Sequence, residues 1–550
     1  MVRIRRQWML SIWVALCLLC CPIPGQAKAP KPTIREQLEA LQDLLHKVDR
    51  QYYEETDIVE LMHGAIEGYL AGLDPHSTYI RPDELKDTQE RLRGSFEGIG
   101  IFFEIVDDVL TVLSPIEGSP AYRAGLLPGD QIRKIDGESA IGPKVQEVTD
   151  RLKGKKGTRV AVSVRREGEP ELLEFEIVRD KIQVPSVPYA FQITPEIGYV
   201  KITRFSSRTA EDLRGYLLDL QQQGARKLIL DLRGNGGGYL EQAVAVANQF
   251  IERGRLLVYT EGRHPNSRED HRAGEDPIIP VDVPVVVMVN GASASASEIV
   301  AGAIQDYDRG LVVGHTTFGK GLVQKQYRLK NGGAVLLTIA RYFTPSDRPI
   351  QRPFTKDRNA YMAAAFDGYD PNLDPDSLSN KPVYYTRILR RKVFGEGGIS
   401  PDVVLQRDSL TTLERQLLRE KHFLVFAKQE EPGIARSYPD FQAFFDRYKV
   451  GRRELSRFKS LLKDRNVVFT EAAFKARSEF IKKQIKQFIA QIRWGAKAEG
   501  MVRVHQDSEV HQAIALFNRA EDLLADRSVH YNRGRTHIPD ASPPLHKQVR

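Results

Sequence analysis

The spacing of apolar residues divides the chain into segments of different character. Apolar side chains that recur every three or four positions, such as Leu38, Leu41 and Leu45, indicate helices, whereas short alternating runs indicate strands. The pattern predicts, in order, helices at residues 33–93, a β-rich module with one helical stretch near 145–152 at 96–182, alternating strands and helices at 198–405, and a basic helical region after 402.

Two apolar runs in the third segment are typical of buried strands. The first, residues 227–232, leads into the glycine-rich loop GNGGG at 234–238, and a helix follows it. The second run occupies residues 284–290. Between them, the charged residues 262–277 predict a mobile loop, and the polar chain from residue 526 predicts a disordered tail.

The N-terminus differs from the rest of the chain. Basic residues precede an apolar run at 8–21, and small residues follow up to Ala27, a pattern typical of a secretory signal that is cut after Ala27. An uncleaved membrane anchor is the alternative interpretation. We therefore expect an exported protein of the periplasm or cell envelope. The remainder of the 550 residues is too long for one hydrophobic core and predicts several water-soluble domains.

Composition excludes several kinds of chemistry. All three cysteines, Cys17, Cys20 and Cys21, lie inside the signal, so thiol catalysis, disulfides and cysteine-bound zinc are not expected in the mature chain. The twelve histidines are scattered and form no metal-binding motif. The net charge of +8 is spread along the chain, so no nucleic-acid partner is expected. We expect no metal and no other cofactor.

The segment GASASASEI at 291–299 lies between a buried strand and a helix. Its small residues let a substrate backbone approach, and the free N–H groups of a helix N-terminus favour a developing oxyanion. A serine in such a turn is suited to nucleophilic attack. These physical grounds alone leave Ser293, Ser295 and Ser297 as equal candidates.

A serine nucleophile needs a base, and the segment TTFGKGLVQ at 316–324 offers Lys320. Apolar neighbours favour burial, which lowers the pKa of a lysine toward the range of a general base, roughly 7–8. Gln324 lies four positions later, on the same face in a strand or a helix, and an uncharged amide can orient the amine. A solvated turn lysine is the alternative interpretation.

The segment GSPAYRAGLLPGDQI at 118–132 resembles a PDZ domain. Such domains bind an extended peptide at a sheet edge and hold its terminal carboxylate with backbone N–H groups. The loop GIGI, Gly98, Ile99, Gly100 and Ile101, is the candidate carboxylate-binding loop, with the two isoleucines lining the side-chain pocket. Alternatively, Ile101 and Phe103 are core residues of a strand.

Together the motifs resemble the carboxyl-terminal processing proteases, which are tail-specific serine peptidases of family S41 with a PDZ domain. The resemblance covers roughly residues 34–404 and rests on the stretches 73–79, 94–101, 230–238, 290–306 and 312–324 with the PDZ segment. It implies a multidomain α+β chain, namely a signal (1–27), an N-terminal helical region (28–93), a PDZ domain (94–183), a crotonase/ClpP-like α/β protease core (184–406), a helical C-terminal domain (407–525) and a tail (526–550).

The resemblance also assigns roles. It implies Ser295 as nucleophile, Lys320 as base and Gln324 as the residue that orients it. It further implies an oxyanion hole from the backbone of Gly236, Gly237 and Ala296, with supporting roles for Glu298, Asp306 and Thr317. The PDZ domain would gate the active site and recruit protein or peptide substrates with apolar C-termini. An adaptor protein and a homo-oligomer are further partner hypotheses.

Three alternatives remain at this stage. His76 and His315 are competing bases for a Ser–His arrangement, although the family does not require a histidine at residue 315. The loop at 234–238 resembles a phosphate loop but lacks the following Lys-Ser/Thr. Finally, a chain that kept its PDZ domain but lost hydrolysis would be a peptide-binding scaffold.

Overall fold

The computed structural model describes residues 32–533, except for 143, 167, 355–356, 359, 362–380 and 408. The signal predicted at residues 1–27 lies outside this range. Residues up to Tyr69 form a unit of their own, which contains α2 (Ile34–Gln51) and most of α3 (Ile58–Ala71). Thr33 and Glu36 form a reciprocal capping box that starts α2. Among the described residues, no helix has the length and apolarity needed to cross a membrane.

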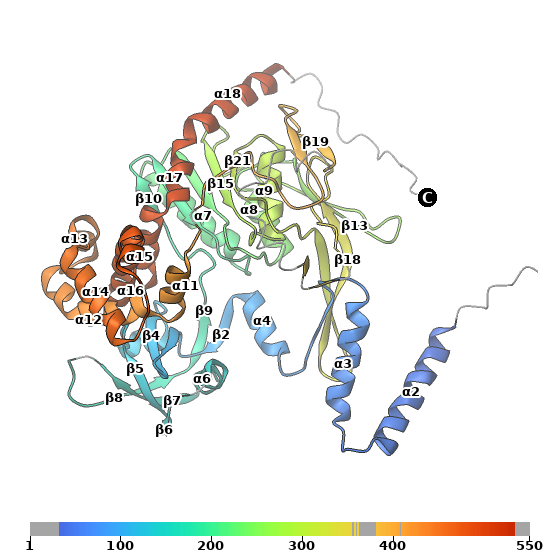
Figure 1. Ribbon diagram of the computed structural model, residues 1–550. Coiled ribbons are helices and arrows are strands. Elements are labelled where there is room, and N and C mark those ends of the chain that lie inside the picture. Colours follow the sequence, from blue (N-terminus) through green and yellow to red (C-terminus); the bar gives the residue numbers. More distant parts are fainter. Residues whose placement is uncertain are drawn as a thin grey trace, which may run out of the picture. The chain divides into compact units, whose positions relative to one another are not determined.

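The β-rich module has a strand order of β3-β4-β5-β7-β8, with β6 beside β5. Its elements are β3 (Ile101–Val106), β4 (Val109–Pro115), α5 (Pro120–Ala124), β5 (Gln131–Ile135), β6 (Glu138–Ser139), α6 (Val145–Leu152), β7 (Arg159–Arg165) and β8 (Leu173–Val178). Leu110, Ile132, Val148 and Val162 are fully buried at its centre, so this module has a core of its own. The predicted helical stretch at 145–152 corresponds to α6 (Figure 1).

A narrow two-stranded ribbon connects this module to the rest of the chain. The incoming strand β2 (Ser95–Gly98) pairs antiparallel with the outgoing strand β9 (Asp180–Gln183). Beside the ribbon, α4 (Leu85–Arg93) ends at Gly94, whose left-handed conformation stops the helix. Both chain connections of the module therefore run side by side, which is the geometry of a hinge.

The centre of the protease-like segment is a mostly parallel sheet with the order β10-β11-β12-β15-β16-β21. Its strands are β10 (Ala190–Thr194), β11 (Ile197–Lys201), β12 (Lys227–Asp231), β15 (Val285–Val289), β16 (Leu311–Gly314) and β21 (Val403–Val404). All five residues of β15 are buried, as expected for a strand covered on both faces. The two buried strands predicted from the sequence are β12 and β15.

Helices cover both faces of this sheet. On one face, α7 (Thr209–Gln222), α8 (Leu240–Ala247) and α9 (Ala296–Asp306) pack against side chains such as Leu230 and Val287. On the other face, α17 (Ser508–Ala515) and α18 (Phe517–Arg533) pack against Ile229 and Met288 (Figure 1). The last two helices that the structure describes thus complete the α/β core, which differs from the single C-terminal domain expected at 407–525.

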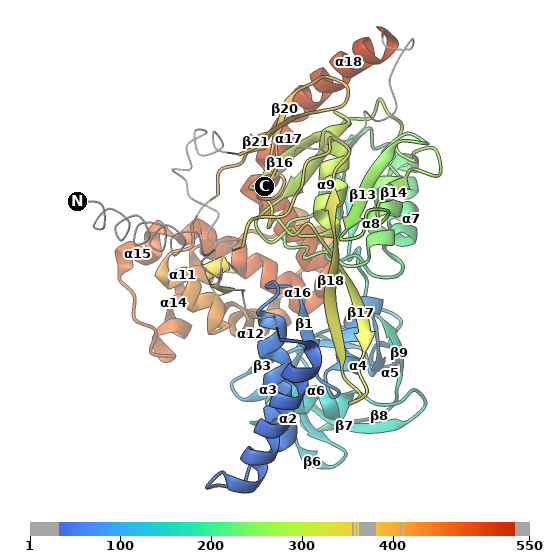
Figure 2. The same cartoon turned by 90° about the vertical axis from the view of Figure 1, so that its right-hand side faces the viewer.

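A second sheet lies beside the first and contains a long hairpin of β17 (Leu322–Arg328) and β18 (Ala334–Phe343), visible in Figure 2. It also contains β1 (Thr78–Ile80), β13 (Leu256–Gly262) and β14 (Glu269–Arg272), and a separate small ribbon pairs β19 (Val383–Tyr385) with β20 (Lys392–Phe394). The expected mobile loop at 262–277 was wrong, because β14 pairs with β13. Its charged side chains face water and hide the strand pattern.

The remaining C-terminal helices form a bundle with a core of its own, including Phe423, Phe458, Ile481 and Ile485. They are α11 (Thr412–Arg419), α12 (His422–Ser437), α13 (Phe441–Arg447), α14 (Arg452–Asp464), α15 (Glu471–Ala476) and α16 (Ser478–Gln506), which is interrupted at Gly495. The prediction of a disordered tail from residue 526 was wrong up to residue 533, because α18 continues to Arg533. Buried Arg527 anchors α18 on the carbonyl oxygen of Tyr307.

Candidate active site

Ser295 lies at the turn between β15 and α9, as the N-cap residue of that helix. Its backbone has φ 57° and ψ −111°, a conformation that is unfavourable for a residue with a side chain. Such strain is found at functional turns because the surrounding structure holds it in place. The turn presents Ser295 at the wall of a cavity of about 740 Å³.

The structure distinguishes among the three candidate serines. Ser293 is fully buried, and its hydroxyl donates to the Leu232 carbonyl oxygen at 2.9 Å. Ser297 is also fully buried and donates to the Asn235 carbonyl oxygen at 2.9 Å. Ser295 alone of the three is partly exposed and lines the cavity. Ser297 therefore holds the glycine loop and Ser293 holds the residue at the end of the preceding strand segment, whereas Ser295 is the one that a substrate can reach.

Glu298 organises the backbone around Ser295. Its carboxylate is fully buried and accepts hydrogen bonds from the N–H groups of Ser295 at 2.8 Å, Gly319 at 2.7 Å and Lys320 at 2.9 Å. The Thr317 hydroxyl donates to it at 2.6 Å. Burial raises the pKa of Glu298, while these hydrogen bonds act to lower it. Glu298 and Thr317 thus belong to one hydrogen-bond network that joins the turn of Ser295 to the segment of Lys320, and their supporting roles stay a prediction.

Lys320 lies just before β17 and lines the same cavity as Ser295 and Gln324. Its amine donates to the Gln324 side-chain oxygen at 2.8 Å, and the Gln324 amide donates to the His76 carbonyl oxygen. Burial lowers the pKa of Lys320 below its usual value of 10.5, although Glu298 and Asp74 act to raise it. The amine is therefore easier to deprotonate than that of a solvated lysine, and a neutral amide orients it.

The glycine loop, residues 234–238, lies directly against the turn that carries Ser295. A Cβ atom on Gly237 would lie 2.8 Å from Ser295 Cβ and 3.2 Å from the amide nitrogen of Ala296, so only glycine fits there. Gly236 and Ala296 also line the cavity. The Gly237 N–H, however, donates to the side-chain oxygen of Asn235 at 2.9 Å. Its predicted role as an oxyanion donor therefore does not match this arrangement, whereas Gly236 and Ala296 remain candidates.

Asp306, another predicted supporting residue, lies at the far end of α9. It is fully buried and receives hydrogen bonds from the guanidinium of Arg348 at 2.7 Å and the backbone of Ser346 at 2.9 Å. It is not among the residues that line the cavity. Asp306 therefore stabilises the packing of α9 and lies away from the site.

Sequence reasoning missed Tyr342 on β18. Its hydroxyl donates to the Lys320 carbonyl oxygen, and it lines the same cavity as Ser295. Burial and the charge of Glu298 raise the pKa of Tyr342 well above its usual value, whereas a hydrogen bond with the Ser295 side chain acts to lower it. Tyr342 is thus a protonated hydroxyl beside Ser295, and no motif around residue 342 marks it.

Neither competing histidine lines the cavity that contains Ser295. The His76 ring contacts the Tyr361 hydroxyl at 3.0 Å, and burial together with the charge of Lys320 lowers its pKa to about 4. His315 is buried near Glu509, at 3.4 Å. His76 does have a function that the sequence did not reveal, since its backbone carbonyl holds Gln324.

In the β-rich module, Ile99 and Ile101 are buried in the domain core, and Phe103 is partly buried against it, so Ile101 and Phe103 are core residues of the strand as the alternative interpretation has it. Gly100 has φ +83°, and a Cβ atom there would lie 2.4 Å from Ser119 Cβ, so the loop requires glycine. β3, which begins at Ile101, ends the strand order of the sheet over the described residues. Peptide binding by Gly98, Ile99, Gly100 and Ile101 stays a prediction.

Comparisons with known proteins agree with this organisation. Residues 196–359 match the model of peptidase family S41, residues 111–166 match a PDZ domain, and residues 412–495 match a family of unknown function. The carboxy-terminal-processing protease of Bartonella bacilliformis is 39% identical over 58% of this chain and 73% of its own length. The carboxy-terminal processing protease CtpA of Bacillus subtilis is 39% identical over 60% of this chain and 70% of its own length.

Among solved structures, the photosystem II D1 C-terminal processing protease is 27% identical, with a TM-score of 0.35. The match covers 69% of this chain and 95% of that one. Over the described residues, no cluster of histidine, cysteine, aspartate or glutamate side chains is arranged to hold a metal ion.

Proposed function

This chain belongs to peptidase family S41 and is a carboxy-terminal processing protease with a PDZ domain, and we propose that it cleaves proteins near their C-termini with Ser295 as nucleophile and Lys320 as general base. One observation carries the proposal. The accessible serine of the nucleophile turn and a buried lysine, whose amine a neutral amide orients, line a single cavity.

The proposed reaction is acyl transfer to serine followed by hydrolysis. The neutral amine of Lys320 accepts the Ser295 hydroxyl proton while Oγ attacks the scissile carbonyl carbon. The Ala296 N–H at the start of α9 and the Gly236 region stabilise the oxyanion, and the lysine ammonium then returns its proton to the leaving amine. Water next gives a proton to Lys320 and attacks the acyl carbon. The Lys320 ammonium returns that proton to Ser295 Oγ as the acyl–oxygen bond breaks, which releases the shortened product and restores both residues.

The scaffold alternative would be favoured by a Lys320 that is held in an ion pair and lies far from Ser295. The Lys320 amine donates its hydrogen bond to the neutral amide of Gln324, and the carboxylates of Glu298 and Asp74 act on it only through their charge. Burial also favours its neutral form. These features support an enzyme.

Cleavage of an unfolded protein that ends in apolar residues tests the proposed function. The purified chain without residues 1–27 is incubated with this substrate and with a copy that ends in aspartates, and the products are read by mass spectrometry. We expect faster cleavage of the apolar version, with cuts near its C-terminus. Equal rates for both versions, or cuts spread along the whole substrate, would contradict C-terminal recognition.

We further propose that the PDZ domain gates cleavage through Lys153, the residue that follows α6. Its amine contacts Asp87 at 2.7 Å and Glu90 at 3.0 Å on α4. On the same helix, Leu92 and Arg93 line the catalytic cavity. A peptide that displaces α6 would therefore move the wall of the active site.

Replacing Lys153 with alanine is expected to uncouple the two sites. The ratio of cleavage rates between the apolar and aspartate-ended substrates should fall toward one, because a movement of α6 is then no longer transmitted to α4. Lys156→Ala is the matched control. Lys156 pairs with Asp180 at 2.6 Å, and Asp180 lies on β9 of the hinge rather than on α4. An unchanged ratio in Lys153→Ala would exclude this route of gating.

Export and self-association complete the proposal. Residues 1–27 are proposed to be removed on export to the periplasm or cell envelope. The mature chain should then begin at Lys28, as its intact mass would show, and a full-length chain would indicate an anchor.

A homo-oligomer is supported by the exposed apolar side chains of α2, including Ile34, Leu38 and Leu44. Light scattering that gives the mass of a monomer would exclude it.

A further inference from the structure

At the start of α17, the carboxylates of Asp507 and Glu509 contact residues that follow two strands of the central sheet. Asp507, the N-cap residue of α17, accepts the backbone N–H of Glu509 at 2.9 Å, which places the side chains of both residues at the start of the helix. The apolar side of α17 packs on the central sheet through Val510 and Ala513. The two carboxylates are therefore held by a packed element of the core.

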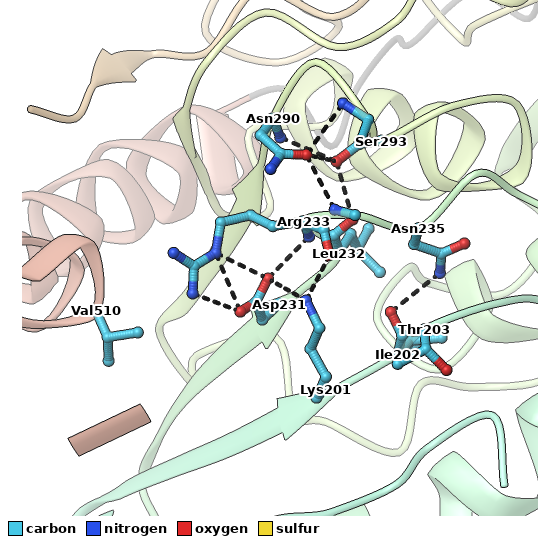
Figure 3. A network of polar contacts seen from close by, with 12 residues as sticks. Lys201, Ile202, Thr203, Asp231, Leu232, Arg233, Asn235, Asn290, Ser293 and Val510 are labelled. Carbon is cyan, nitrogen blue, oxygen red and sulfur yellow. Dashed lines mark hydrogen bonds and ion pairs between the residues drawn. The ribbon is translucent and has the colours of Figure 1, made fainter. Parts of the chain in front are cut away.

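Arg233 is the first partner of these carboxylates. It lies two residues after the end of β12 and directly before the glycine loop, whose Gly237 contacts the nucleophile turn. Its guanidinium binds Asp231 at 2.7 Å, Asp507 at 2.9 Å and also Glu509. Figure 3 shows Arg233 folded back on Asp231, with Lys201 donating to the same carboxylate.

His315 is the second partner of Glu509. It directly follows β16, and its backbone N–H donates to the Val289 carbonyl oxygen at the end of β15. Its Nε2 atom lies 3.4 Å from the Glu509 carboxylate. Two residues further on, Thr317 binds Glu298, and Lys320 follows. This strand end therefore leads directly to the proposed base.

The surroundings of Glu509 favour its charged form. Burial acts to raise the pKa of this carboxyl, but the neighbouring His315 and the charge of Arg233 lower it below its usual value. The side chains of Arg233 and Glu509 are both only 12% exposed, so water screens their attraction weakly. A single ionised carboxylate thus touches both chain segments that lead into the active site.

We propose that Glu509 is a positioning residue that couples the C-terminal helices to catalysis. Glu509 contacts Arg233, which follows β12 and precedes the glycine loop. It also contacts His315, which follows β16 and precedes Lys320. One side chain thus links the ends of these two strands. Reacting groups that are displaced by about 1 Å react on the order of 10²-fold more slowly. A contact that holds both segments in place therefore affects the turnover rate. The inference rests on the proposed roles of Ser295 and Lys320.

The chain offers a matched control on the same strand. Glu521 of α18 pairs with Lys227 at 2.6 Å. Lys227 is the first residue of β12, whereas Arg233 lies beyond its last residue. Glu521 therefore makes the same kind of contact between a C-terminal helix and β12, but at the end of the strand that is remote from the glycine loop.

The experiment measures kcat, KM and thermal unfolding for Glu509→Ala, Glu509→Gln and Glu521→Ala in the mature chain. Glu509→Ala is expected to lower kcat by about tenfold or more with a KM close to that of the parent, since the loss concerns the reacting groups. Glu509→Gln keeps an acceptor without the charge and should fall between Glu509→Ala and the parent. Glu521→Ala should retain the kcat of the parent.

Two outcomes would overturn the proposal, namely a kcat in Glu509→Ala equal to that in Glu521→Ala, or a change confined to KM. If Glu509→Ala unfolds at the assay temperature, the folded Glu509→Gln variant decides, and a parental kcat in it rejects the role of the charge. Failure of the proposed function has a different signature, because the parent chain would then cleave nothing or Ser295→Ala would keep its activity.

Discussion

Ser295→Ala is expected to lower the cleavage rate on the order of 10³-fold or more while the protein folds like the parent. The hydroxyl is the proposed nucleophile, and no covalent step is possible without it. The substitution removes one oxygen from the wall of an open cavity and leaves the buried hydroxyls of Ser293 and Ser297 in place. The measurements are kcat/KM on the unfolded substrate and the midpoint of thermal unfolding.

Ser297→Ala is the control for this prediction. Its hydroxyl serves the fold, because it donates to the Asn235 carbonyl oxygen in the glycine loop, and a buried acceptor left without its donor costs about 1–3 kcal/mol. Ser297→Ala should therefore unfold at a lower temperature and keep most of its activity. The reverse pattern, in which Ser297→Ala is inactive and Ser295→Ala cleaves normally, would assign the nucleophile to Ser297.

Lys320→Ala and Lys320→Arg are both expected to lose activity to a similar extent as Ser295→Ala. Arginine keeps the positive charge, but its pKa above 12 prevents it from accepting the serine proton. The pair of variants thus separates a proton acceptor from a mere charge. An active Lys320→Arg variant would show that Lys320 contributes only its charge, and the proposed mechanism would then be wrong.

The pH dependence of the parent follows from the same residue. Burial disfavours the charged ammonium, so the pKa of Lys320 lies below its usual 10.5 and the neutral base is present at lower pH than in a solvated lysine. We expect kcat/KM to rise with pH as Lys320 loses its proton and to level off below pH 10.5. Because Glu298 and Asp74 act to raise this pKa, removing either charge should shift the rise to lower pH.

The sequence predicted the parts of the site that lie within one continuous motif. Strand, turn and helix around Ser295 follow from the apolar run of β15, the small residues after it and the helical spacing of α9. The contact between Lys320 and Gln324 was also predicted, but for an incomplete reason. Lys320 lies before β17, and a register shift at Gln324 redirects the strand locally.

The parts that the sequence did not reveal depend on contacts between distant segments. Tyr342 and the His76 carbonyl approach Lys320 and Gln324 from other strands and loops, and no local pattern marks them. β14 carries charged residues on a solvent-exposed edge, so it lacks the alternation of a half-buried strand. Glu509 looks like an ordinary acidic residue in the first turn of a helix until Arg233 and His315 are placed beside it.

The most direct test of the central claim is covalent labelling of the active serine. The mature parent, Ser295→Ala and Lys320→Ala are treated with a fluorophosphonate that reacts with activated serines, and the labelled residue is located by peptide mass mapping. The account predicts one adduct, on Ser295, in the parent, no adduct in Ser295→Ala and much slower labelling in Lys320→Ala. An adduct on Ser293 or Ser297, or equally fast labelling without Lys320, would contradict a Ser295–Lys320 catalytic pair.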